Sequence, residues 1–229
     1  MTTIPANLQA VKARIGTACA AAGRDHAEVR LLAVSKTWPA DSVREATACG
    51  QRAFGESYVQ EGVAKIHALA DLDLEWHFIG PLQSNKTRAV AENFAWVHGI
   101  DRLKIAERLS AQRPAGWPPL QVCVEVNVSG EASKSGVAPA DAPALCHAVA
   151  ALPGLCLRGL MAIPEPTSDI NLARSRFRAL RELHERLNHE GLNLDTLSMG
   201  MSDDLEAAIM EGATIVRVGT AVFGKRQYT

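Results

Sequence analysis

The sequence predicts one α/β domain, a (β/α)8 TIM barrel with an extra N-terminal helix. Short apolar runs of strand length alternate with stretches of helical spacing, a pattern typical of a parallel sheet with crossover helices. Eight such runs fit into about 200 residues, which favours a closed barrel, although periodicity alone also permits a doubly wound sheet. No linker or low-complexity tract divides residues 1–229, so we expect a single domain.

The elements follow in order along the chain. Leu8, Val11, Ile15 and Ala18 recur at helical spacing, which predicts a helix within residues 1–24, ahead of the barrel. The predicted strands lie at residues 31–34, 53–54, 76–79, 95–97, 122–128, 155–160, 194–197 and 214–218. Apolar residues at helical spacing between them predict helices that include 59–69 and 177–187.

The composition is that of an ordinary folded protein without a strong charge. Of the 229 residues, 47% are hydrophobic and 21% are charged, and the net charge is −1. This balance argues against nucleic acid or an anionic membrane as the main partner. No apolar stretch approaches the ~20 residues that span a bilayer, and the N-terminus lacks the pattern of a secretory signal. Five cysteines without a CxxC pair favour buried thiols in a reducing cytoplasm.

The common nucleotide, hydrolase and metal motifs do not occur. The patterns GxxxxGK[ST], GxGxxG and GxSxG are missing, which removes the usual P-loop, dinucleotide and nucleophile-elbow sites. His184 and His189 are one residue too far apart to share a helix face as they do in zinc proteases. We therefore predict no metal site.

Polar and glycine residues gather where the predicted strands end. In a TIM barrel the functional site lies at the C-terminal ends of the strands. The candidate site residues at these positions are Lys36, Ser57, Asn127, Met161, Ser198, Gly200, Ser202, Arg217, Gly219 and Thr220.

The loops after the seventh and eighth predicted strands are candidates for a phosphate site. "SMGMSDDLEAAI" runs into a helix with Ser202 at the expected N-cap and two aspartates in the first turn, and "RVGTAVFG" precedes another helix start. Helix N-termini bind anions, and these two loops are a recurrent phosphate site in barrels. Each loop alone is explained by a capped helix or a glycine turn, but together they favour phosphate.

Lys36 and Arg217 each permit two interpretations. Lys36 ends the apolar run "LLAVSKT", and such a lysine commonly extends to solvent, while a partly desolvated amine forms a Schiff base with an aldehyde. Arg217 lies in the apolar strand "TIVRVGTA" and requires an acceptor, either Glu125 in an ion pair or an acceptor atom of a ligand. The first and eighth strands adjoin in a closed barrel, which brings Lys36 close to the phosphate loops.

The chain closely resembles the YggS/PROSC family of pyridoxal 5′-phosphate (PLP) homeostasis proteins, which have the fold of the alanine racemase N-terminal domain. The resemblance covers almost the whole length, in the order "LLAVSKT", "FGESYVQE", "WHFIGPLQSNK", "EVNVSGEASKSG", "GLMAIP", "LSMGMSDDLEAAI" and "RVGTAVFG". One position differs, because Ser57 stands where the family usually has asparagine. A side-chain amide contact from this loop is therefore not expected.

The resemblance implies a role for each candidate residue. Lys36 would hold PLP as a Schiff base, and Arg217 would face the pyridine nitrogen. The resemblance also implies a phosphate site formed by Ser202, Gly219 and Thr220, with Ser198 or Gly200 nearby. It implies a pocket lined by Asn127, Met161 and Ser57.

The sequence favours a non-catalytic PLP-binding protein that stores or delivers this form of vitamin B6 and so influences amino- and keto-acid balance. An arginine at the pyridine nitrogen disfavours its protonation and weakens the electron sink that PLP enzymes use. A two-base racemase needs a second proton carrier, which alanine racemases take from a further domain, whereas here the chain ends soon after the eighth strand, with only Tyr58 and Tyr228 as tyrosines. The alternatives are a PLP-dependent racemase of narrow activity and a barrel that binds another phosphorylated metabolite non-covalently.

Partners and assembly follow from the same interpretation. PLP-dependent apo-enzymes are the expected recipients of delivered PLP, and a monomer is expected. Lys134 and Lys225 are further amines near the rim, for which solvated surface positions are the favoured interpretation.

Overall fold

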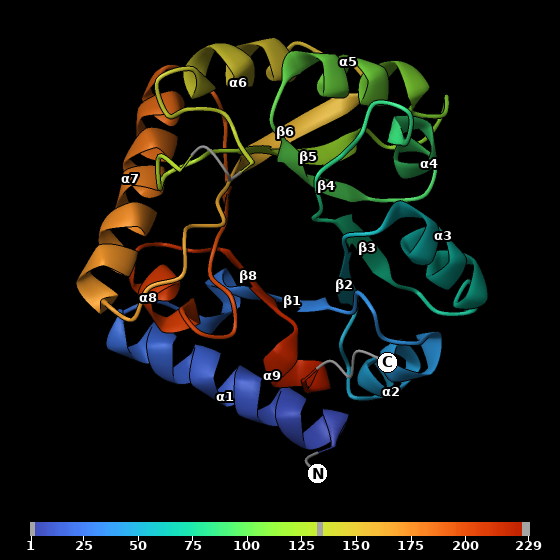
Figure 1. The fold of residues 1–229 in the computed structure, drawn as a ribbon, viewed down its shortest axis with the longest axis vertical. Helices are drawn as coiled ribbons and strands as arrows, with labels where there is room; N and C mark the ends of the chain where they lie inside the picture. The colour runs from blue at the N-terminus through green and yellow to red at the C-terminus, as the bar shows by residue number, and fades with distance from the viewer. Residues whose placement is uncertain (1–2, 132–134, 226–229) are drawn as a thin grey trace.

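The computed structural model describes residues 3–131 and 135–225 and contains a closed barrel of parallel strands (Figure 1). The strands pair in sequence order from the first to the eighth, and the eighth pairs with the first. They are β1 Arg30–Val34, β2 Ala53–Glu56, β3 Glu75–Phe78, β4 Trp96–Ile100, β5 Leu120–Glu125, β6 Leu155–Met161, β7 Thr196–Ser198 and β8 Ile215–Val218. Each overlaps one of the eight predicted apolar runs, and the predicted (β/α)8 fold is confirmed.

Helices surround the barrel on its outer side (Figure 1). In the described ranges they are α1 Ile4–Ala21, α2 Ala40–Ala48, α3 Val59–Ala68, α4 Thr87–Ala91, α5 Leu103–Gln112, α6 Ala142–Ala150, α7 Ile170–His189, α8 Leu205–Met210 and α9 Thr220–Phe223. None of these described helices is both long enough and apolar enough to cross a membrane. The apolar faces of the helices and the outward faces of the strands form the main core, which is nearly closed to solvent.

The extra N-terminal helix is present as α1. Thr3 caps its start by accepting a hydrogen bond from the Ala6 amide at 3.4 Å, and the predicted apolar positions are buried. The helix lies along α8 and α9, beside the seam where β8 meets β1 (Figure 1). Arg14 ties it to α8 through Glu206 at 2.9 Å and to the loop before α8 through the Ser202 carbonyl at 3.0 Å.

Two predicted boundaries were wrong. The fifth strand ends at Glu125, because Asn127 folds the following chain into a turn by donating to the Glu131 carbonyl and accepting from the Gly130 amide. Ser202 is not the N-cap of the eighth helix. That position belongs to Asp204, and its carboxylate accepts a hydrogen bond from the Met201 amide at 2.6 Å.

The interior of the barrel is filled by a second, smaller group of side chains. It contains the apolar residues Leu32, Ala53, Trp96, Cys123, Met161 and Ile215. Buried polar side chains accompany them, including His77, His98, Ser198 and Arg217. The interior is therefore a packed core with a polar component, as is usual in this fold, and it is closed beneath the rim.

Candidate functional site

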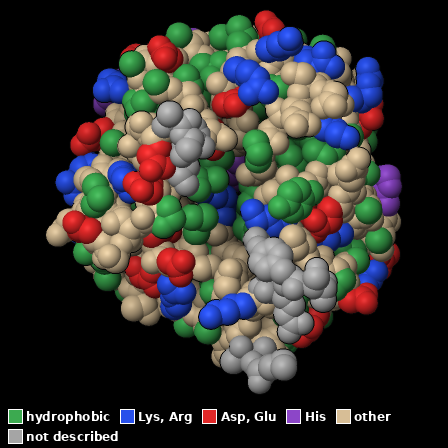
Figure 2. Space-filling view, in the orientation of Figure 1, with side chains coloured by type: hydrophobic (Ala, Val, Ile, Leu, Met, Phe, Trp, Pro, Cys, Tyr) green, Lys and Arg blue, Asp and Glu red, His purple; other side chains and the backbone are tan. Residues whose placement is uncertain are grey.

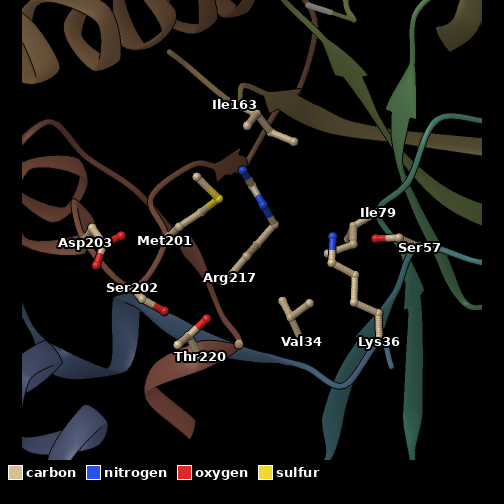
Figure 3. A pocket seen from close by; sticks show the side chains of 11 residues that line it. Val34, Lys36, Ser57, Ile79, Ile163, Met201, Ser202, Asp203, Arg217 and Thr220 are labelled. Atoms are coloured by element: carbon tan, nitrogen blue, oxygen red, sulfur yellow. The ribbon is translucent and has the colours of Figure 1, made fainter. Parts of the chain in front are cut away.

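A pocket opens at the C-terminal end of the barrel, with a volume of about 210 Å³. The face shown in Figure 2 is hollowed near its centre, and Lys or Arg side chains are visible there. The residues that line the pocket come from the ends of β1, β2, β3, β6, β7 and β8 and the loops after them (Figure 3). They are Val34, Lys36, Ser57, Ile79, Ile163, Met201, Ser202, Asp203, Arg217, Gly219 and Thr220.

The backbone around Lys36 is held firmly on both sides. The Ser35 carbonyl accepts a hydrogen bond from Lys65 Nζ at 2.7 Å, and the Thr37 amide donates to Glu61 Oε1 at 2.6 Å. Thr37 has φ of 69°, a left-handed conformation that costs energy for a residue with a Cβ. The contacts of Lys65 and Glu61 offset this strain, and they fix the direction in which the Lys36 side chain leaves the strand.

A buried carboxylate completes this support. Glu56 Oε1 accepts from Ser35 Oγ at 2.6 Å and from Lys65 Nζ at 2.8 Å, while its Oε2 is buried without a hydrogen-bond partner. Burial raises the pKa of Glu56, and the charge of Lys65 opposes the rise. Sequence analysis did not identify Glu56, Glu61 and Lys65 as support for the lysine loop, because Lys65 lies on an amphipathic helix whose polar residues normally face solvent.

Two hydroxyl groups lie together on the other side of the pocket. Ser202 and Thr220 are adjacent, across Arg217 from Lys36 and Ser57 (Figure 3). Ser202 Oγ accepts a hydrogen bond from the Ala221 amide at 3.4 Å, and this contact links the loop after β7 to the start of α9. Gly219 immediately precedes α9, so backbone amides at this point are not needed by the helix and are suited to an anion.

Gly200 allows the loop after β7 to pass close to α8. Its φ is 92°, and a Cβ at this position would lie 2.6 Å from the Ala208 side chain. The Gly200 carbonyl accepts from the Arg217 amide at 2.9 Å. Gly200 therefore shapes the pocket through the backbone and is not one of the residues that line it.

Arg217 is buried, with 3% of its surface exposed, yet its side chain borders the pocket. Its guanidinium donates to the Ser198 carbonyl at 2.6 Å, to Ser198 Oγ at 2.7 Å and to the Ala162 carbonyl at 2.9 Å. Burial lowers the pKa of Arg217 to about 10, and the charge of Glu125 opposes the decrease. Of the two acceptors that the sequence allowed for Arg217, the one in an ion pair with Glu125 is not used among the described residues, because the guanidinium donates to Ser198 and Ala162 instead.

The structure brings six of the ten predicted site residues to one pocket: Lys36, Ser57, Ser202, Arg217, Gly219 and Thr220. The other four lie elsewhere. Ser198 is buried against Arg217, Gly200 lies behind the loop, Met161 packs in the barrel interior, and Asn127 is occupied by its own turn. Lys225 is exposed, while Lys134 and Tyr228 lie outside the described residues.

Sequence analysis missed five lining residues: Val34, Ile79, Ile163, Met201 and Asp203. Four of them are apolar and stand at or just beyond a strand end, where they are indistinguishable in sequence from core residues. For Val34, Ile79, Met201 and Asp203, the available signal was their closeness in sequence to Lys36, Gly80 and Ser202. Together the four apolar residues form the apolar wall of the pocket, which lies among its polar groups and suits a flat ring (Figure 3).

Comparison with known proteins agrees with this geometry. Residues 6–227 match the family described as the alanine racemase N-terminal domain. A pyridoxal phosphate homeostasis protein of Pseudomonas aeruginosa is 66% identical, over 100% of this chain and 98% of that protein. The protein of the same name in Escherichia coli K12 is 54% identical, over 100% and 99%. The chain belongs to this family. Within the alanine racemase N-terminal domain family, it is similar over its whole given length to the pyridoxal phosphate homeostasis proteins.

Solved structures of the family have the same architecture. PipY of Synechococcus elongatus, in its structure without PLP, is 38% identical with a TM-score of 0.87, over 97% of this chain and 100% of that one. PipY with PLP bound is 39% identical with a TM-score of 0.80, over 92% and 100%. An alanine racemase of Clostridium difficile is only 14% identical, with a TM-score of 0.74 over 99% of this chain and 57% of that one, and shares the fold.

Proposed function

We propose that this protein binds PLP in the pocket at the C-terminal end of the barrel, as a Schiff base with Lys36, and serves in PLP homeostasis. The observation that carries the proposal is the placement of one lysine amine, one arginine and a pair of hydroxyl groups around a single pocket. PLP, when bound, supplies an aldehyde for the amine, a ring and a phosphate. The groups present fit all three parts.

Each part of PLP has a matching part of the pocket. Ser202, Thr220 and the backbone at Gly219 would hold the phosphate. The apolar side chains of Val34 and Ile163 would cover the ring. Lys36 would meet the aldehyde, and the two hydroxyl groups lie across Arg217 from it in the same pocket (Figure 3). Relatives named for PLP homeostasis, and a relative solved with PLP bound, support this assignment.

Arg217 permits a carrier, and the other groups of the pocket favour a carrier over a racemase. Its guanidinium carries a permanent charge, and facing the pyridine nitrogen it would disfavour protonation there. Of the described lining residues, Lys36 and Asp203 are the ones whose side chains exchange protons readily, and Asp203 lies on the side of the hydroxyl pair (Figure 3). That arrangement offers a racemase no second base across from Lys36. We infer that the protein stores PLP and delivers it to apo-enzymes, in the cytoplasm and as a monomer.

The proposal is tested by absorbance and mass mapping. The purified protein is incubated with PLP and treated with borohydride, and the reduced adduct is located by peptide mass. We expect the visible absorbance band to disappear and the label to be found on Lys36. Lys36→Ala should lose band and label, whereas the matched Lys225→Ala, which removes an exposed lysine, should keep both. An adduct spread over surface lysines in both variants would contradict the proposal.

The racemase alternative has its own measurement. A screen of amino acids with the PLP-loaded protein, followed by chiral separation, should show no turnover above that of the Lys36→Ala variant. Sustained turnover that depends on Lys36 would establish an enzyme in place of a carrier. Tight binding of another phosphorylated metabolite, with no PLP uptake, would favour the non-covalent alternative.

A further inference from the structure

A line of polar side chains crosses the apolar interior of the barrel behind the pocket. It begins with Glu75 and His77 on β3, continues through His98 on β4 and Ser198 on β7, and ends at Arg217 on β8. Apart from Glu75, each of these residues is 3% exposed or less. Buried polar groups cost free energy unless they are paired, so their pairing in this core is informative.

Every neighbouring pair in this line is within hydrogen-bond distance. His77 Nε2 lies 2.5 Å from Glu75 Oε1, and His77 Nδ1 lies 2.9 Å from His98 Nε2. His98 Nδ1 lies 2.8 Å from Ser198 Oγ, which accepts from the Arg217 guanidinium at 2.7 Å. We call these five residues the interior chain.

The two ends fix the direction of every hydrogen bond. Arg217 can only donate, so Ser198 Oγ accepts from it and keeps its own proton available for His98 Nδ1. At the other end Glu75 can only accept. Burial opposes its ionisation, but the hydrogen bond from His77 and the ion pair with Arg30 keep the pKa of Glu75 below its usual value. His77 must therefore carry its proton on Nε2 and accept at Nδ1 from His98 Nε2.

Both histidines are then neutral and protonated on Nε2, and each contact has one donor and one acceptor. Burial lowers the pKa of His77 and the pKa of His98, which agrees with neutral rings near pH 7. A second proton on His77 would place a donor at Nδ1 and reverse the bond to His98. The Ser198 hydroxyl would then lose its acceptor, so the neutral arrangement alone satisfies the whole interior chain.

The interior chain reaches the opposite end of the barrel. Glu75 is the first residue of β3, and it forms an ion pair with Arg30, the first residue of β1. Both residues line a separate cavity of about 250 Å³ at the N-terminal ends of the strands. Glu75, at the far end of the barrel, is thus connected to Arg217 at the pocket by an unbroken series of hydrogen bonds.

We propose that His77, His98 and Ser198 are positioning residues that orient the Arg217 guanidinium, and that Glu75 sets their tautomers from the far end of the barrel. The inference rests on the proposed function, in which Arg217 faces the pyridine nitrogen of bound PLP. Two carbonyl groups, of Ser198 and Ala162, hold the guanidinium in place, and the Ser198 hydroxyl determines the third contact. While His98 accepts from it, the hydroxyl proton points away from Arg217 and a lone pair of Ser198 Oγ faces the guanidinium.

The first test reads the interior chain itself, without PLP. Nuclear magnetic resonance of nitrogen-labelled histidine distinguishes the two neutral tautomers. We expect two buried histidines with the proton on Nε2, assigned by their loss in His77→Gln and His98→Gln. A proton on Nδ1 of either ring, or a charged ring at neutral pH, would overturn the proposed direction.

The second test acts at the far end and reads PLP. Glu75→Gln keeps an oxygen that accepts from His77, whereas Glu75→Met has similar size and no acceptor. We expect Glu75→Met to weaken PLP binding by about tenfold and to shift the absorbance maximum of bound PLP, since one buried hydrogen bond is lost. Glu75→Gln should match the unmodified protein closely in PLP affinity and in the absorbance maximum of bound PLP.

The outcomes separate the two proposals. If the unmodified protein forms no borohydride-stable adduct at Lys36, the proposed function fails whatever the histidine tautomers are. If it binds PLP normally, and Glu75→Met shows the same affinity and absorbance maximum, this inference alone is wrong. Circular dichroism of each variant, together with urea unfolding, excludes loss of the fold as the cause of a change.

Discussion

At the scale of single residues, the pocket depends on charged groups that are buried away from it. Glu56 and Lys65 are both buried and form an ion pair at 2.8 Å beneath the loop that carries Lys36. Removing one member of such a pair leaves the other charge desolvated and unpaired. The lysine loop and the stability of the fold are therefore linked through the same contact.

Lys65→Met should destabilise the protein strongly for this reason. The expected loss is about 3–5 kcal/mol of unfolding free energy, because the carboxylate of Glu56 stays buried without its partner. Urea unfolding measures the loss. The double variant Glu56→Gln/Lys65→Met should recover part of it, and Arg44→Met, which breaks the exposed pair with Asp71, should change stability far less. A loss in Lys65→Met no larger than that in Arg44→Met would contradict the assignment.

Glu125 gives the protein a defined pH dependence. Burial raises its pKa from 4.5 to about 7 in the folded state, against the charge of Arg217. Between these values the unfolded chain loses the proton while the folded protein keeps it, so stability falls as pH rises from 4.5 to 7. The shift corresponds to about 3 kcal/mol.

Glu125→Gln should remove this fall. Urea unfolding below pH 4.5 and above pH 7 should show the unmodified protein losing stability relative to the variant across that interval. Parallel stability profiles for the two proteins would show that Glu125 does not titrate in this range. The comparison is made without PLP, so it reports on the protein alone.

At the scale of elements, close approaches between loops decide the shape of the pocket. The backbone after β3 passes so near the loop after β2 that a Cβ at Gly80 would lie 2.4 Å from the Ser57 carbonyl oxygen. Ser57 lines the pocket, so this contact fixes one of its walls. Gly16, in the middle of α1, has no such neighbour, and a Cβ there would make ordinary contact with His26 at 3.6 Å.

The two glycines should respond to alanine in opposite ways. Gly80→Ala should cost about 1–3 kcal/mol, because backbone must move, and it should also weaken PLP binding. Gly16→Ala should stabilise the protein by about 0.5–1 kcal/mol through the helix and leave PLP binding unchanged. Thermal unfolding and PLP titration of both variants check this contrast. Equal effects of the two substitutions would argue against a specific role for the Gly80 contact.

Sequence patterns predicted the order and type of elements well, and the pocket in part. Apolar runs mark strands because a parallel barrel buries both faces of its sheet. Lys36 and Arg217 could be singled out because charged groups next to buried strands are unusual. The apolar wall could not, since Ile163 and Ile79 have the composition of core residues. His98 was missed, and Glu56 could be named only as a possible acid or base without a partner, because the partners of both residues come from other elements and no local pattern marks such pairs.

At the scale of the whole molecule, α1 supports the side of the pocket that carries Ser202. Arg14 donates to both carboxylate oxygens of Glu206 and to the Ser202 carbonyl, at 2.9 to 3.0 Å. This helix thus joins the outside of the β8–β1 seam to a loop that lines the pocket. The extra helix has a role in the site as well as in covering the barrel.

Arg14→Met should separate these roles. Because the ion pair is partly exposed, the loss of stability should be about 1 kcal/mol or less, while release of PLP should become faster as the Ser202 loop loosens. The rate of release is measured by diluting the PLP-loaded protein and following its absorbance over time. The matched variant Lys12→Met, on the same helix, should release PLP at the unmodified rate. An unchanged rate in Arg14→Met would mean that the loop is held by its other contacts.

Closure of the barrel by β8 against β1 also has a consequence for how the protein is made. Lys36 precedes Gly219 and Thr220 by more than 180 residues, so it leaves the ribosome well before them. A nascent chain therefore displays the Lys36 amine long before the opposite side of the pocket exists. Under the proposed function, the PLP site is therefore incomplete until β8 has been made, and a chain cut short before β8 should not retain PLP.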